Sequence, residues 1–233
     1  MSKKFLSMIM SLMVATSLIG CGSANTKGNS DTASVSNKTI NEASDKDKNL
    51  EGTWAEDYTL DQIKSFYKEY SDKIEKITKE FGLEYSKDET IKGENEEKVT
   101  DNCIYFDNKN ADKNKIESMY FGMKTYGEDL SSGEISLKLS LKFDGEGAIK
   151  NNDFDLGKTS FDKYISVITG EENRDYSDLN KQIIDGLKNG ETEVTINNTI
   201  DGLKEEVIVS KEYIIYKLST KKYVFADAEI SME

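Results

Sequence analysis

The sequence has no histidine and no proline, and Arg174 is the single arginine in 233 residues. Histidine is the side chain whose ordinary pKa lies near neutral pH, and it is also the commonest metal ligand. Its absence excludes the Ser-His-Asp and Cys-His catalytic arrangements, as well as a zinc site built with imidazole. Any catalysis would have to rely on groups such as carboxylates.

Cysteine is nearly as scarce, since only Cys21 and Cys103 occur. Cys103 stands directly before Ile104-Tyr105-Phe106, a pattern typical of a β-strand. A nucleophilic thiol needs a neighbouring base, usually histidine. We therefore predict a buried strand cysteine, with a reactive thiol as the alternative.

Positive charge is under-represented, because 44 Asp and Glu residues outnumber 31 Lys and Arg residues, which gives a formal net charge of -13. An acidic surface repels nucleic acid and anionic lipid headgroups, so we expect no nucleic-acid partner. The simplest interpretation is that this charge keeps the domain soluble. An acidic patch for a cationic partner is the alternative.

Long apolar runs are absent except near the N-terminus, where residues 5–18 follow Lys3 and Lys4. This run of about 14 residues would be roughly 21 Å long as a helix, which is shorter than the hydrocarbon core of a bilayer. A basic start, a short apolar run and small residues after it are the three parts of a cleavable secretory signal. We therefore predict a signal peptide over residues 1–20.

The signal ends in Leu18-Ile19-Gly20-Cys21, which resembles the lipobox of bacterial lipoproteins at all four positions. The resemblance implies an S-diacylglyceryl group on Cys21, with N-acylation by a palmitate-type chain as a further modification. It also implies that lipoprotein processing enzymes recognise Leu18, Ile19 and Gly20 and cut before Cys21. Because two acyl chains anchor a protein stably, we expect a lipoprotein on the extracytoplasmic face of the cell membrane. Cys103 would then be the only free thiol, so no intramolecular disulfide is expected.

Residues 21–50 are rich in Ser, Asn, Thr, Asp, Lys and Gly and show neither a helical nor a strand period. Such a segment buries too little apolar surface to offset the entropy of ordering, so we predict a flexible tether with a reach of roughly 30 Å. Residues 51–233 then form one acidic extracytoplasmic domain. The abundance of Lys, Asn, Ile and Tyr is what A/T-rich codons produce, which favours a low-GC Gram-positive host.

A long helix is predicted over residues 59–81, where apolar side chains recur every three or four positions. Thr59 and Gln62 fit a capping box at its start, and Gly82 provides a C-terminal stop. The single apolar stripe predicts packing against a sheet, with a coiled coil as the alternative.

After Gly82 the apolar period changes to two, and a second cycle of helices and strands follows. The order of helix, strands, helices, strands predicts an α+β fold in which helices pack on antiparallel meander sheets. The same order suggests a duplicated helix-plus-strands unit. The predicted strands lie at 104–106, 116–126, 135–143, 194–196, 207–209, 213–218 and 223–228, and the later helices at 161–168 and 176–187.

One segment partly follows the ligand spacing of a calcium loop, with oxygen-bearing side chains at Asn151, Asp153, Asp155 and Asp162. The turn glycine and the terminal bidentate glutamate of such a loop are missing, so a solvated turn is the preferred interpretation and weak Ca²⁺ binding the alternative. The preceding Asp144-Gly145-Glu146-Gly147 is likewise predicted to form a hairpin turn.

Gly52-Thr53-Trp54 is similar to the motif with which lipocalins begin, whose tryptophan closes a ligand-holding barrel. Here a long helix follows in place of a strand. We therefore predict that Trp54 caps the core of its own domain, with a small-molecule barrel as the alternative.

Cys21 is the one residue whose chemistry the sequence identifies, and no catalytic residue, cofactor or metal ligand is assigned. The first hypothesis is a non-enzymatic, membrane-anchored binding or interaction module, in which a sheet face or the Tyr-rich strands contact an extracytoplasmic ligand or protein. One alternative is a cell-envelope enzyme that uses carboxylates only. Another is a small-ligand or solute-binding lipoprotein.

Overall fold

The computed structural model describes residues 50–94 and 97–225. The predictions for the signal peptide, for Leu18 to Cys21 and for the tether up to residue 49 concern residues outside this part. The helical elements are η2 (Thr53–Ala55), α1 (Leu60–Glu80), α2 (Gly145–Asn151), η3 (Leu156–Lys158), α3 (Phe161–Thr169) and α4 (Ser177–Lys188). The strands are β1 (Ser86–Glu94), β2 (Glu97–Asp107), β3 (Lys115–Tyr126), β4 (Ser132–Lys142), β5 (Val194–Ile200), β6 (Leu203–Val209), β7 (Tyr213–Ser219) and β8 (Tyr223–Val224).

All eight strands form one antiparallel sheet in the order β1-β2-β3-β4-β7-β6-β5, and the short β8 extends the pairing of β4 beyond β7. The predicted α+β architecture is confirmed. Its two meanders, β1 to β4 and β5 to β7, meet where β4 pairs with β7, so they share one sheet. The sheet is open, because β1 and β5 lie at opposite ends of the strand order. The lipocalin-like barrel alternative is therefore wrong.

Helix α1 begins and ends where the sequence predicts. The side chain of Thr59 accepts from the backbone N–H of Gln62, and the side chain of Gln62 accepts from the backbone N–H of Thr59, which completes the capping box. At the other end Gly82 has φ +69°, a left-handed conformation that glycine adopts without a Cβ penalty. The apolar stripe packs on the sheet, where Tyr67 stacks on Phe121 of β3 with 5.5 Å between ring centroids.

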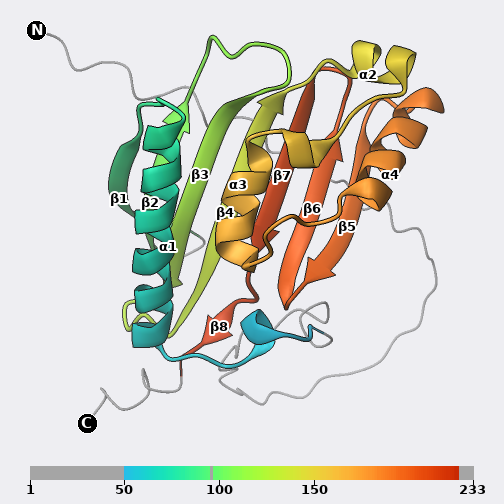
Figure 1. Ribbon diagram of the computed structural model, residues 1–233. Helices are drawn as coiled ribbons and strands as arrows, with labels where there is room; N and C mark the ends of the chain where they lie inside the picture. Colours follow the sequence, from blue (N-terminus) through green and yellow to red (C-terminus); the bar gives the residue numbers. More distant parts are fainter. Residues whose placement is uncertain (1–49, 95–96, 226–233) are drawn as a thin grey trace, which may run out of the picture. The chain divides into compact units, whose positions relative to one another are not determined.

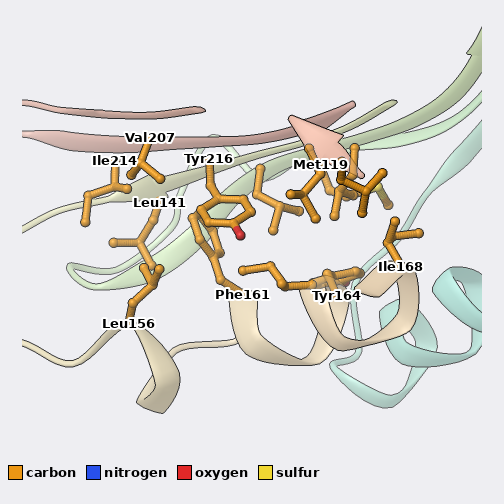
Figure 2. Close-up of a cluster of buried hydrophobic side chains, with 14 of the residues drawn as sticks. Met119, Leu141, Leu156, Phe161, Tyr164, Ile168, Val207, Ile214 and Tyr216 are labelled. Carbon is orange, nitrogen blue, oxygen red and sulfur yellow. The ribbon is translucent and has the colours of Figure 1, made fainter. Parts of the chain in front are cut away.

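The core lies between the sheet and helices α1, α3 and α4, which lie in front of the sheet in Figure 1. Leu141, Tyr216 and Met119 point from the strands toward Phe161 and Tyr164 of α3 (Figure 2). All five side chains are buried, and burying a large apolar side chain contributes about 1.5–3 kcal/mol. The hydroxyl of Tyr164 is satisfied by Thr78 of α1 at 3.1 Å, so this polar group links two helices inside the core.

Trp54 closes one end of this core, as predicted. Its side chain is buried and packs against two aromatic rings of α1, at 5.8 Å from Phe66 and 5.6 Å from Tyr70. Its backbone N–H donates to the carbonyl of Asp201, the first residue of the turn between β5 and β6. The N-terminal turn η2 is thereby attached to that hairpin.

Two local predictions are wrong. Strand β1 is missing from the sequence-based assignment, because it is an edge strand whose only large apolar side chain, Ile91, is exposed, so it shows no alternating pattern. The predicted hairpin turn at Asp144 to Gly147 is the start of α2. The carboxylate of Asp144 accepts from the backbone N–H of Gly147, and Gly145 leaves room for the backbone of Lys211, so the helix starts despite two glycines.

Candidate functional site

Helices α1, α3 and α4 lie on one face of the sheet, and no described element covers the other face (Figure 1). We call this second face the open face. Its side chains are those that alternate with the buried positions of each strand, and most are exposed or half-buried. Three are aliphatic, namely Val99, Ile208 and Ile215. Many of the others are polar or aromatic: Tyr105 from β2, Tyr120 and Lys124 from β3, Ser136 and Lys138 from β4, Tyr213 and Lys217 from β7, and Glu206 from β6.

A row of directly paired residues crosses the centre of the open face. Tyr120 pairs with Lys138, Lys138 with Lys217, and Lys217 with Glu206. Lys217 forms an ion pair with Glu206 at 2.5 Å, whereas Lys138 has no ion-pair partner among the described residues. Burial and the neighbouring charge of Lys217 lower the pKa of Lys138. Like charges directly opposite each other destabilise a sheet, so this pair is a position where an anion would be stabilising.

Tyr120 packs over Gly122, a position on the open face that has no side chain. Its ring lies over Gly122, where an added Cβ would come within 2.2 Å of the tyrosine hydroxyl oxygen. That hydroxyl donates to Asp101 of β2 at 2.6 Å. Burial and the Asp101 carboxylate raise the pKa of Tyr120, so it remains a neutral donor. An aromatic ring that packs over a strand glycine is a recognised way to stabilise such a position.

Cys103 also lies on the open face. It belongs to β2, as predicted, but it is half-buried, so the prediction of a buried side chain was only partly right. It pairs with Asp88 on one side and Gly122 on the other. Burial and the carboxylate of Asp101 raise the pKa of its thiol to about 11. A thiol with such a pKa is protonated at neutral pH, which disfavours the reactive alternative.

On the covered face, a buried ion pair joins Arg174 to Glu205. The guanidinium binds both carboxylate oxygens, at 2.7 Å and 3.1 Å, and also donates to the hydroxyl of Tyr216 at 2.9 Å. The Glu205 side chain is fully buried. Burial acts to raise the pKa of Glu205, but the hydrogen bonds from Arg174 and Tyr216 outweigh it and hold the pKa below its usual value. The carboxylate is therefore charged inside the protein.

Two further residues complete this cluster. Asn198 of β5 donates to Glu205 at 3.0 Å, and the guanidinium of Arg174 lies 5.0 Å from the ring centroid of Tyr176. Beside it is a shallow, open depression lined by Arg174, Asn197, Asn198 and Thr199. Because Arg174 makes three hydrogen bonds to side chains of β6 and β7, the cluster fastens the loop between α3 and α4 to the sheet.

This cluster was not predicted from the sequence, although two signals were present. Arg174 is the only arginine, and arginine is the residue best suited to a bidentate, buried carboxylate contact. Glu205 occupies an apolar-face position in β6, where it alternates with the buried Leu203 and Val207. A charged residue at such a position requires a partner.

The side chains of the segment from Asn151 to Asp162, which partly follows the spacing of a calcium loop, do not converge on one site. Asn151 ends α2, Asp155 caps η3 by accepting from the N–H of Gly157, and Asp162 lies in the first turn of α3. Asp155 also accepts from Asn180 at 3.1 Å. No cluster of three or more potential metal-binding side chains of His, Cys, Asp or Glu occurs in the described residues.

The carboxylate-enzyme alternative calls for an acid whose pKa is raised beside one that stays ionised. Four carboxyl groups of the described chain have shifted pKa values, and in every case the pKa is lowered: Glu75, Asp144, Asp175 and Glu205. No specific observation in the described part of the chain therefore favours that alternative.

Comparison of the chain with family models, with curated proteins and with solved structures found no match. Among residues 50–94 and 97–225, no helix is both long and apolar enough to cross a membrane. The predicted lipidation site Cys21 and its recognition residues Leu18, Ile19 and Gly20 lie outside the described residues.

Proposed function

We propose that the chain is a lipid-anchored lipoprotein that binds an extracytoplasmic ligand or protein through the open face of its sheet. The observation that carries the anchor is the position of Leu18-Ile19-Gly20-Cys21 at the end of a short apolar run. A diacylglyceryl group would hold the protein at the cell membrane.

The open face supports the binding role through its composition. Although the chain is acidic, the described side chains of this face include seven lysines and six carboxylates: Lys92, Lys115, Lys124, Lys138, Lys142, Lys204 and Lys217 with Asp88, Asp101, Asp107, Glu117, Glu134 and Glu206. Tyrosines stand beside them, and tyrosine offers both apolar area and a hydrogen-bonding group. At the centre of this face Lys138 and Lys217 stand directly opposite each other, so the partner group that suits this position is anionic.

The anchor is tested by Cys21→Ser in intact cells. We expect loss of lipid labelling, and the protein should remain unprocessed or move from the membrane to the medium. A lipid-labelled, membrane-bound product of the variant would refute the anchor.

The binding surface is tested with a photo-activated cross-linking residue placed in the full chain. At Ser136, near the centre of the open face, we expect cross-links to a defined partner in intact cells. The matched position is Gln182, which is exposed on α4 on the helical side. Equal capture at both positions, or none at Ser136, would argue against the open face. Lys138→Glu should weaken the Ser136 cross-link, because it adds negative charge opposite an anionic partner.

A further inference from the structure

The strand β5 forms one end of the sheet and pairs only with β6 among the described strands. Its sequence, Val-Thr-Ile-Asn-Asn-Thr-Ile, contains no charged residue and no proline. The unpaired backbone N–H and C=O groups of such an edge strand can pair with a strand of another chain. Charged side chains or proline usually prevent this pairing.

The hairpin that follows β5 determines which of its backbone groups are free. Asp201 and Gly202 have φ values of +47° and +85°, and Ile200 pairs directly with Leu203 across them. In a two-residue hairpin of this type the flanking residues form a hydrogen-bonded pair, and the bonding direction then alternates along the strand. The N–H and C=O groups of Thr195, Asn197 and Thr199 therefore point away from β6. We call these groups the β5 edge.

We propose that the β5 edge pairs antiparallel with the β5 edge of a second copy of this chain, about a twofold axis at Asn197. In this register Asn197 faces its own copy, Thr195 faces Thr199, and Val194 faces Ile200. Residues whose backbone N–H and C=O groups point away from β6 thus face residues of the same kind in the second copy, as a hydrogen-bonded ladder requires. Three such residues on each copy, each with one donor and one acceptor, make about six main-chain hydrogen bonds.

The side chains of the open face match across the same axis. Thr195 and Thr199 are exposed on the open face, and Thr–Thr pairs are favourable across strands. On the helical face the β-branched Val194 and Ile200, each buried in its own chain, face each other, whereas Ile196 faces Asn198 of the second copy. An isologous contact of this kind closes as a dimer and leaves no further free edge at β5.

The acidic residues that flank β5 limit the pairing to this strand. In the same register Glu193 would face Asp201 of the second copy, and like charges at this position oppose longer pairing. Added salt screens such exposed charges, so association should strengthen as ionic strength rises.

The test introduces a single thiol at the proposed axis. Asn197→Cys is made in the full chain with Cys21→Ser and Cys103→Ser and is purified in detergent, so that the new thiol is the only one. Directly opposed residues of a hydrogen-bonded pair lie at a Cα separation that permits a disulfide. We expect mild oxidation to yield a covalent dimer. The matched control is Thr90→Cys, the central residue of β1, which should give several-fold less dimer.

A second measurement does not depend on disulfide formation. Sedimentation should show reversible dimers of the full chain, and Asn197→Lys should weaken them because two lysines would face each other. A mixture of Asn197→Lys and Asn197→Asp chains should recover dimers. A chain that stays monomeric up to about 100 µM, a weak-affinity limit, would overturn the proposal, and so would equal cross-linking at positions 90 and 197. The inference holds whether or not the chain is lipidated.

Discussion

The two ends of the sheet are built in opposite ways. Five of the nine residues of β1 are charged, namely Lys87, Asp88, Glu89, Lys92 and Glu94, whereas none of the seven residues of β5 is. Charged side chains on an edge strand discourage pairing with other chains. The contrast between the two edges of one sheet indicates that β1 is protected from pairing and β5 is left available for it.

The two edges are also attached to the helical layer differently. At the β1 end, Lys87 forms an ion pair with Glu75 of α1 at 2.5 Å, and the lysine is half-exposed. At the β5 end, Asn198 binds the buried Glu205, which is held by Arg174. An exposed ion pair contributes little to stability, whereas breaking a buried one is costly because it leaves an unpaired charge inside the protein.

The largest effect is expected when the attachment at the β5 end is broken. Arg174→Met leaves the Glu205 carboxylate buried without its cation, so we expect the free energy of unfolding to fall by about 3–5 kcal/mol. Urea denaturation of the full chain measures it. In the double variant Arg174→Met, Glu205→Met no unpaired charge remains, and much of the loss should be recovered. A loss below about 1 kcal/mol in the single variant would mean that water reaches Glu205 freely.

A smaller effect is expected when one glycine at each end of the sheet is replaced by alanine. Gly202→Ala places a Cβ at φ +85° and within 2.4 Å of the backbone nitrogen of Ala55, so we expect destabilisation of more than about 1 kcal/mol. Among the described residues, no atom lies within 4 Å of a Cβ added at Gly93 of β1. Gly93→Ala should therefore be neutral or stabilising by up to about 1 kcal/mol, through its effect on the unfolded chain. Thermal unfolding of both variants gives the comparison, and an equal loss in both would contradict it.

The sequence predicts those elements whose local signals agree with their burial. Helix α1 has its caps and one apolar stripe, and β4 alternates cleanly, so both were found. Strand β1 was missed because an edge strand buries little on either face. Its residues are mostly charged or polar, so they show no alternating apolar pattern. Glu205 was missed because its partner, Arg174, lies 31 residues away, and only folding shows that the two charges meet. The open face follows from strand alternation, but the side on which the helices pack does not.

The smallest effect is expected at the β1 attachment, and pH provides the means to measure it. Hydrogen bonds from Lys79, Lys87 and Tyr85 lower the pKa of Glu75 from its usual 4.5 to about 2. A carboxylate whose pKa is lower in the folded state stabilises that state above the unfolded pKa, and this contribution disappears as pH falls through the folded value. Glu75→Gln should therefore lower the Tm at pH 7, and the difference from the parent should shrink between pH 4.5 and about 2. A difference that stays constant over this range would show that Glu75 contributes through packing and not through its charge.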